Sequence, residues 1–331
     1  MTDDRNESTT IRSWDNYWQH ARNSSAYSGG GTTHPAVRDF WHRFFSAARD
    51  EFAHPRLADI ASGSGAVAEA ARTAFGTGSV ELTCVDVSEA AIAALEERFP
   101  DVSGIVADAR QIPLPSASFD IVCSQFGIEY AGLDAMAEWL RLVAPGGRLA
   151  LLLHHDGGGI HRQCAASLDA TRQLQGVNFI GKAGAMFAAG FRMLREGSRD
   201  EYEAAVGDLI PAIRALESIM RQHGREVADG AVLKLYTDVR EMTARLPNYD
   251  EGEVAEWLQR MRGEFRAYAG RMASMCEAAI DANTFTTLCT EIEAAGFELL
   301  RNEALLNAGT GVPLAWALIA AAQESDKAAI A

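Results

Sequence analysis

The chain has 331 residues, 48% of them hydrophobic, which is enough for one large domain with an insertion or for two domains. Its formal net charge is −15, from 45 acidic residues against 30 lysines and arginines. A protein that holds nucleic-acid phosphates needs a basic surface, and no lysine or arginine cluster stands out. The composition therefore argues against a nucleic-acid substrate.

Features that would place the chain outside the cytosol are not expected from the sequence. The amino-terminal residues are polar and acidic, unlike a signal peptide. No apolar run approaches the roughly 20 residues that span a bilayer. The five cysteines are scattered, and Cys84 and Cys123 fall inside expected buried strands. We therefore expect a cytoplasmic protein with no membrane partner.

The first segment in chain order is rich in aromatic residues. Residues 11–31 include Trp14, Tyr17 and Trp18 and end in three consecutive glycines. The three aromatic residues fall at i, i+3 and i+4, a spacing typical of an amphipathic helix that packs on a domain. A second helical region, over about 35–52, leads into the first expected strand.

A glycine turn follows that strand. Residues 56–65 read R-L-A-D-I-A-S-G-S-G, and a helical pattern begins at Ala66. The order strand, glycine turn, helix suits a nucleotide-type ligand. Glycines let the backbone approach the ligand closely, and the helix N-terminus offers free amides. The spacing is not G-x-G-x-x-G, so a dinucleotide fingerprint is a forced interpretation.

Two further acidic residues follow at the ends of expected strands. A β-rich run ends in Asp86, at the place where such folds bind ribose hydroxyls. Ser88 is expected to cap the next helix, over about 89–99. A third strand, I-V-A-D-A-R, contains Asp108 and Ala109 and is followed by P-L-P-S-A-S-F-D-I-V, which leads into the fourth strand.

The remaining elements divide into a fifth strand, a helical stretch and a late return to strands. The run R-L-V-A-P-G-G-R-L-A-L-L-L contains a turn at residues 145–147 and a strand that ends near residue 155. Residues 157–283 show helical periodicity with no convincing strand. A helix over 284–295 and strands over 297–306 and 312–322 complete the pattern.

Together these motifs resemble the class I (Rossmann-like) S-adenosylmethionine (SAM)-dependent methyltransferases of the small-molecule type. Their motif I is usually written [D/E]-x-G-x-G-x-G, and here Asp59, Ala61, Gly63 and Gly65 fill its four positions. Ala61 departs from the first glycine. The resemblance implies an α/β fold with a seven-stranded mixed sheet and helices on both faces. The helical periodicity of residues 157–283 adds a large helical insertion after the fifth strand.

The motifs and the periodicity along the chain predict four parts. Residues 1–45 would form an aromatic, helical segment that caps the cofactor site, and residues 46–156 the SAM-binding core. Residues 157–283 would form the helical insertion, which serves either as a cap with substrate contacts or as a homodimer surface. Residues 284–325 would complete the core with a helix and a strand hairpin.

The implied cofactor is SAM, and its product is S-adenosylhomocysteine. In the family, Asp86 would hold the ribose, while Asp108 and the amide of Ala109 would lie against the adenine. The amino-terminal aromatic rings would shield the sulfonium through cation–π contacts, with plain packing as the alternative. The expected cofactor-binding residues are Asp59, Ala61, Ser62, Gly63, Gly65, Asp86, Val87, Asp108, Ala109, Gln125, Phe126, Tyr17 and Trp18.

Methyl transfer requires few catalytic side chains, because the sulfonium already activates the methyl group. A general base is needed when the acceptor is protonated. The candidates are His154 and His155, at the end of the fifth strand. Adjacent strand residues point to opposite faces, so at most one of them can serve, and a structural histidine is the alternative for each. Glu129 and Tyr130 could orient an acceptor or simply begin the next helix.

We expect no metal. The histidine–aspartate cluster of residues 154–161 could in principle hold zinc or iron, but the rings of adjacent strand histidines diverge. Metal-dependent relatives carry an acidic ligand after the fourth strand, where this chain has Ser124, Gln125 and Phe126.

The sequence therefore predicts an enzyme that transfers a methyl group to oxygen, nitrogen or carbon of a small metabolite. The fourth strand lacks the [D/N/S]-P-P-[Y/F] motif that the family uses on nucleobases and protein glutamine. Two alternatives stay open. One is a SAM-binding protein without methyl transfer that acts as a regulator or partner subunit, and the other is a different SAM-dependent group transferase.

Overall fold

The computed structural model describes residues 34–197 and 199–324. These residues form two compact units. The first unit takes the described residues up to Arg162 and from Ser274 onward, and the second is Gln163–Ala273. The second unit lies within the insertion expected at residues 157–283.

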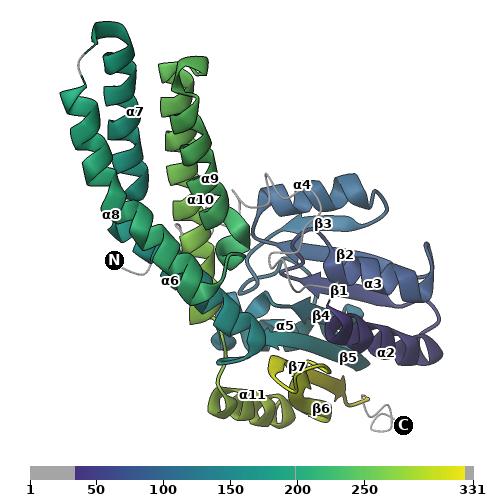
Figure 1. Cartoon of the computed structure of the whole chain (residues 1–331). Helices are drawn as coiled ribbons and strands as arrows, with labels where there is room; N and C mark the ends of the chain where they lie inside the picture. The colour runs from purple at the N-terminus through teal and green to yellow at the C-terminus, as the bar shows by residue number, and fades with distance from the viewer. Residues whose placement is uncertain (1–33, 198, 325–331) are drawn as a thin grey trace, which may run out of the picture. The chain divides into compact units, whose positions relative to one another are not determined.

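The first unit contains a seven-stranded sheet in the order β3-β2-β1-β4-β5-β7-β6 (Figure 1). Strands β1 to β5 pair in parallel, and β7 pairs antiparallel with both of its neighbours. The mixed seven-stranded sheet predicted from the resemblance is therefore confirmed. The strands are β1 (Arg56–Ile60), β2 (Glu81–Asp86), β3 (Ser103–Val106), β4 (Phe119–Gln125), β5 (Val143–His154), β6 (Phe297–Leu306) and β7 (Pro313–Ala322).

Helices cover both faces of this sheet, because its central parallel strands are apolar on both sides. Along β5, Leu152 packs on one face and Leu151 and Leu153 pack on the other. One face carries α2 (Pro35–Glu51), α3 (Ala66–Phe75) and α4 (Glu89–Arg98), and the other carries α5 (Met136–Leu142) and α11 (Ala282–Ala294). Short 3-10 turns, η2 (Ile128–Ala131) and η3 (Leu133–Ala135), connect β4 to α5.

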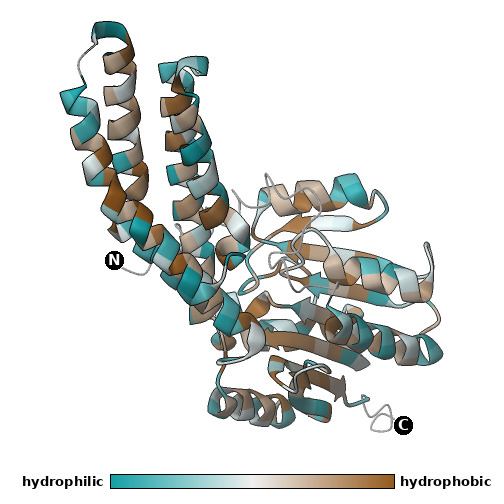
Figure 2. Ribbon diagram, viewed as in Figure 1, coloured by the Kyte–Doolittle hydropathy of each residue, from teal (hydrophilic) through white to brown (hydrophobic). Residues whose placement is uncertain are grey.

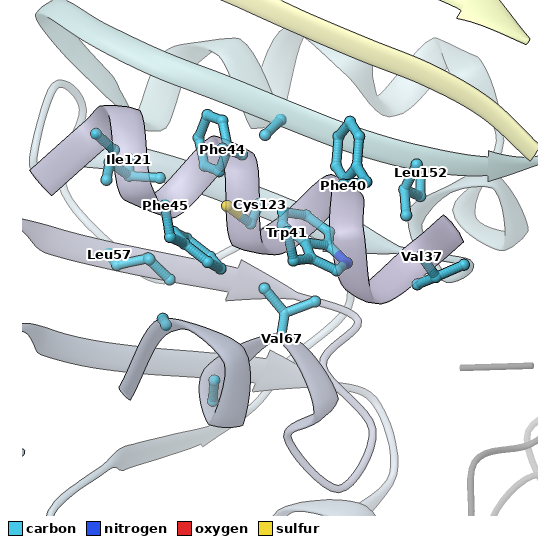
Figure 3. Packing of buried hydrophobic residues seen from close by; sticks show 14 of the residues in the cluster. Val37, Phe40, Trp41, Phe44, Phe45, Leu57, Val67, Ile121, Cys123 and Leu152 are labelled. Atoms are coloured by element: carbon cyan, nitrogen blue, oxygen red, sulfur yellow. The ribbon is translucent and has the colours of Figure 1, made fainter. Parts of the chain in front are cut away.

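Helix α2 packs an aromatic stripe on the first of these faces (Figure 3). The helix starts where Pro35 fixes its first turn and the imidazole of His34 accepts a hydrogen bond from the amide of Ala36. Trp41 is fully buried and stacks on Phe45, with ring centroids 5.4 Å apart. The helix runs through residue 45, the expected end of the amino-terminal segment, so residues 35–45 are part of this packing layer.

The second unit is built from helices. They are α6 (Gly159–Gly176), α7 (Phe179–Glu196), α8 (Asp200–His223), α9 (Ala231–Ala244) and α10 (Glu251–Glu277), with turns η4 (Val227–Gly230) and η5 (Leu246–Asn248). Helices α6 and α10 begin and end, respectively, in the first unit. Hydrophilic and hydrophobic residues alternate around these helices (Figure 2), as expected for amphipathic segments. Their apolar sides share one core that includes Phe187, Leu216 and Leu235. The predicted helical insertion after the fifth strand is confirmed.

The helices in the described part of the chain include none that is both long and apolar enough to cross a membrane.

Replacing Trp41 with alanine tests the packing role of α2. Removing this buried ring is expected to lower the free energy of unfolding by about 3–5 kcal/mol, because it leaves a cavity between α2 and the sheet. Urea unfolding followed by circular dichroism measures the change. The exposed neighbour Arg43 provides the control, since Arg43→Ala is expected to stay within about 0.5 kcal/mol of wild type. Equal effects of the two substitutions would contradict this role.

Candidate cofactor and acceptor site

The turn between β1 and α3 is shaped by left-handed backbone conformations. Ala61, Gly63 and Gly65 have φ values of 54°, 53° and 86°. A Cβ atom on Gly65 would lie 3.0 Å from a methyl carbon of Leu95, so this glycine also allows α4 to approach. The amide of Ser62 donates to the carbonyl of Val85 at 3.1 Å, which ties the turn to the end of β2.

Asp86 links this turn to the next loop. One carboxylate oxygen accepts from the amide of Gly63 at 2.8 Å, and the other accepts from the amide of Ser88 at 2.9 Å. The hydroxyl of Ser88 accepts from the amide of Ala91, so Ser88 caps α4 as expected. The Asp86 side chain is thus held at the carboxyl edge of the sheet, beside the glycine turn.

Asp59 lies in β1, just before the glycine turn, and is fully buried. Neither of its carboxylate oxygens has a hydrogen-bond partner among the described residues. Burial, and then the nearby charge of Asp86, raise the pKa of Asp59 well above its ordinary value. In the sheet it is flanked by Cys84 and Cys123. Burial also raises the pKa of both thiols well above the usual range, so neither behaves as a reactive thiolate.

In the loop after β3, Asp108 forms an ion pair with Arg110 that was not predicted from the sequence. Arg110 donates to both carboxylate oxygens of Asp108, with distances of 2.6 and 3.1 Å. Hydrogen bonds from Arg110 lower the pKa of Asp108. The carbonyl of Ala109 accepts from the indole of Trp139 at 3.2 Å, which fixes the backbone that follows. Asp108 can reach a ligand amino group only by sharing or releasing Arg110.

Apolar side chains are exposed at the same edge. Val87, which follows Asp86, is 41% exposed, and Val106, at the end of β3, is 49% exposed. Exposed apolar side chains next to Asp86 and close to Asp108 in the chain suit a flat ligand ring.

The loop after β4 meets the glycine turn. A Cβ atom on Gly127 would lie 2.5 Å from the Cβ of Ala61 and 2.8 Å from its carbonyl oxygen. Phe126, just before it, has a φ of 54°. Gln125 accepts a hydrogen bond of 2.6 Å from the indole of Trp41, so α2 fixes its side chain. Since the strand order reverses between β1 and β4, these two loops form the topological switch point, where α/β sheets bind ligands.

Gly127 was not among the residues predicted from the sequence. The available signal was a glycine placed two residues after the end of a buried strand, and the sequence does not reveal that another loop crosses it. Tyr17 and Trp18, which were predicted to contact the cofactor, lie outside the described residues.

His154 and Glu129 form a buried pair at the ends of β5 and β4. Their side chains are 2% and 1% exposed. One carboxylate oxygen of Glu129 lies 2.6 Å from Nδ1 of His154 and accepts from the backbone amide of His154 at 2.9 Å. The other oxygen, Oε2, has no partner among the described residues. The rings of Phe126 and Tyr130 lie 4.7 and 5.8 Å from the imidazole.

His155 lies on the opposite side of the sheet. Its ring stacks on Trp316 with centroids 4.2 Å apart, and Trp316 in turn stacks on Phe285 of α11. Its Nδ1 lies 2.5 Å from the carbonyl oxygen of Asp156. The structure therefore brings two of the three predicted catalytic residues together and separates the third from them.

The histidine–aspartate cluster does not converge. His161 lies 3.5 Å from Asp156 and accepts from the amide of Gly157. Within residues 34–197 and 199–324, no group of three histidine, cysteine or carboxylate side chains could hold a metal ion.

The helical unit has an open pocket of its own, with a volume of about 270 Å³. It lies at the ends of α9 and α10 that η5 joins, and it combines carboxylates with aromatic and aliphatic side chains. The lining residues are Asp238, Glu241, Met242, Tyr249, Glu253, Val254 and Trp257.

Replacing Asp59 with asparagine tests the buried carboxylate. Because the pKa of Asp59 is raised in the folded state, its contribution favours folding at low pH and is lost as pH rises through the folded-state value. An asparagine side chain cannot ionise, so the Asp59→Asn variant is expected to lose less stability than wild type between pH 5 and pH 8. Urea unfolding at both pH values measures the difference. A wild-type loss no larger than that of the variant would contradict the assignment.

Replacing Gly127 with alanine tests the contact between the two loops. Because the added Cβ would overlap Ala61, the backbone must shift, and the free energy of unfolding is expected to fall by about 1–3 kcal/mol. Chemical denaturation measures it. Gly207→Ala in α8 is the control, since its Cβ meets nothing within 4 Å and is expected to stabilise the helix by about 0.5–1 kcal/mol. Unchanged stability in the Gly127 variant would show that the loops separate easily.

Part of the first unit is similar to known methyltransferases. Residues 58–151 match the model of a methyltransferase domain family. The ubiquinone/menaquinone biosynthesis C-methyltransferase UbiE of Ralstonia pickettii is 38% identical over 104 residues, which cover 29% of this chain and 42% of the relative. The demethylmenaquinone methyltransferase of Renibacterium salmoninarum is 29% identical over 113 residues, covering 34% and 46%. The chain thus spans less than half the length of these two relatives.

Among solved structures, the plantazolicin methyltransferase BpumL in complex with SAH aligns over 98% of this chain and 99% of its own. The sequence identity is 10%, and the TM-score is 0.48. The family match covers the strands and turns that build the glycine turn, the Asp86 loop and the Asp108 loop. The family match therefore places a methyltransferase domain of the class I, SAM-dependent kind at residues 58–151.

Proposed function

We propose that the protein is a SAM-dependent methyltransferase that transfers a methyl group to oxygen, nitrogen or carbon of a small molecule in the cytoplasm. The observation that carries this proposal is the position of Asp86, oriented by the amides of Gly63 and Ser88 at the switch point of the sheet. A carboxylate fixed there is placed to accept two hydrogen bonds from ribose hydroxyls.

The residues at this edge fit a cofactor that carries a sulfonium, an ammonium and an adenine. Asp59 lies buried in β1, next to the glycine turn that precedes α3. Gly63 adds no side chain to the left-handed turn, and Val87 is exposed for contact with a ring. In this proposal Ala61, Ser62, Gly65, Asp108, Ala109, Gln125 and Phe126 complete the cofactor site. SAM, when bound, would supply an activated methyl group.

The relatives suggest a chemical class for the methyl acceptor. They are named as methyltransferases of ubiquinone and menaquinone biosynthesis, so we include ring-shaped metabolites of that kind among the acceptors. The negative charge of the chain and the family of its relatives both favour a small molecule over nucleic acid.

We further propose that the helical unit sets acceptor specificity. It follows β5 in the chain after a connection of only a few residues, and insertions at the carboxyl end of a strand commonly border the ligand site. A homodimer formed through these helices is the competing role.

Substituting Asp86 tests the cofactor assignment. Asp86→Ala is expected to weaken SAM binding by about 1.5–3 kcal/mol, since two charge-assisted hydrogen bonds to the ribose are lost. Isothermal titration calorimetry with SAM measures the change. Glu81→Ala, at the exposed opposite end of the same strand, is the control and should bind SAM as the wild type does. Unchanged affinity in the Asp86 variant would refute the site.

Methyl transfer itself is tested with SAM carrying a ¹³C-labelled methyl group and a small-molecule extract of the producing cells. We expect the label to appear in a component of the extract and to require Asp86. SAM binding without transfer to any component would instead favour a regulatory SAM-binding protein.

A further inference from the structure

We infer that the pocket of the helical unit binds a linear aliphatic diamine or polyamine through its carboxylates and its aromatic rings. All the residues that line this pocket belong to the second unit, on α9, on α10 and just before α10. The residues proposed to hold SAM belong to the first unit, so the inference goes beyond the proposed function and does not depend on it. It is carried by the cavity and by the chemistry of its lining.

Part of the pocket wall is apolar and belongs to the core of the helical unit. Met242 and Val254 line the pocket and are buried in that core. Trp257 packs against the same core and also lines the pocket. A wall of this kind gains from covering methylene groups, whereas it offers no hydrogen bonds to a ligand that is polar throughout. The ligand therefore needs an aliphatic part.

Two aromatic rings of the lining are available to a cation. Trp257 is half-buried, and Tyr249 is 37% exposed. Among the residues that the structure describes, neither ring forms an aromatic pair or a cation–π contact. The face of an indole or a phenol ring attracts an ammonium group, most strongly where the group is partly removed from water. An aromatic lining beside carboxylates thus favours an organic cation.

The charged residues of the lining are all acidic. Asp238 accepts a hydrogen bond of 2.7 Å from Lys234, whose side chain is 73% exposed. Glu241 of α9 and Glu253 of α10 are exposed, and neither forms an ion pair with any residue of the described ranges. No lysine or arginine lines the pocket, so an anion would meet only repulsion there. Two carboxylates, one from each helix, remain for a cationic ligand.

The arrangement of these carboxylates favours a diamine over a metal ion. Within the described ranges, no three histidine, cysteine or carboxylate side chains converge closely enough to hold a metal, so the three acidic groups of the pocket do not share one point. Positive charges at two points, joined by a methylene chain, match two separate carboxylates and an apolar wall. The volume of about 270 Å³ lies just below the range of drug-sized sites, which suits a small linear molecule.

The first experiment titrates the full chain with 1,5-diaminopentane and follows tryptophan fluorescence. We expect a saturable change with a dissociation constant of roughly 0.1–1 mM, since the carboxylates are exposed and each contributes modestly. The change should disappear in Trp257→Phe, which keeps an aromatic ring in the pocket but removes the reporter. No saturable change in the wild type, or an unaltered change in the variant, would overturn the inference.

The second experiment removes one charge at a time and measures the affinity for the same diamine by isothermal titration calorimetry. Glu241→Gln and Glu253→Gln are each expected to weaken binding by about 3–10-fold, because each loses a charge-assisted hydrogen bond at an exposed site. Glu256→Gln is the matched control, since Glu256 is exposed on the same helix but does not line the pocket. Equal losses in all three variants would show that the diamine follows only the net charge, and would overturn the inference.

Two further ligands test the need for two positive charges. 1-Aminopentane has the same chain with one ammonium group and is expected to bind about 5–10-fold more weakly than the diamine. 1,5-Pentanediol has no charge and is expected to give no measurable binding. A monoamine or a diol that binds as tightly as the diamine would overturn the inference. None of these outcomes alters the SAM site, which Asp86→Ala tests separately.

Discussion

The hydrogen bond from the amide of Gly63 to Asp86 is the contact on which the carboxyl edge of the sheet depends. It joins the loop after β1 to the loop after β2, while the close approach of Gly127 to Ala61 joins the loop after β1 to that after β4. Ala61 and Phe126 adopt left-handed conformations that cost non-glycine residues about 1–2 kcal/mol each. These loops keep such conformations because each is held by its neighbours, so the site is a single connected arrangement.

The same edge contains carboxylate oxygens that are buried without a hydrogen-bond partner among the described residues. Asp59 has two buried oxygens without partners, and Glu129 has one, within the described residues. Burying such groups is unfavourable unless they are hydrogen-bonded or protonated. The aliphatic and aromatic clusters on both faces of the sheet supply the stability that compensates for them. Buried polar groups of this kind concentrate at functional sites, where ligand contacts replace the missing partners.

Local sequence patterns were sufficient to place the acidic residues on the strands. Asp59 lies in the strand that a glycine turn follows, and Asp86 ends a β-rich run, so both positions follow from short-range periodicity. The contacts that orient the side chains come from distant parts of the chain. Trp41 and Gln125 are 84 residues apart, and nothing local to either residue predicts their hydrogen bond. The hydrogen bonds from Arg110 to Asp108 depend on the side-chain conformation of Arg110, which a sequence motif does not specify either.

Local sequence patterns do not determine the different roles of the adjacent histidines, His154 and His155. Strand alternation requires them to face opposite sides of the sheet, but it does not say which side carries the chemistry. That choice depends on the turn after β4, which brings Glu129 to the face of His154, and on α11, which brings Phe285 to Trp316 on the face of His155. The carboxylate of Glu129 lies beside the imidazole of His154, whereas the imidazole of His155 is part of a stack of aromatic rings. The tertiary neighbours of each histidine, more than its position in the strand, therefore determine its role.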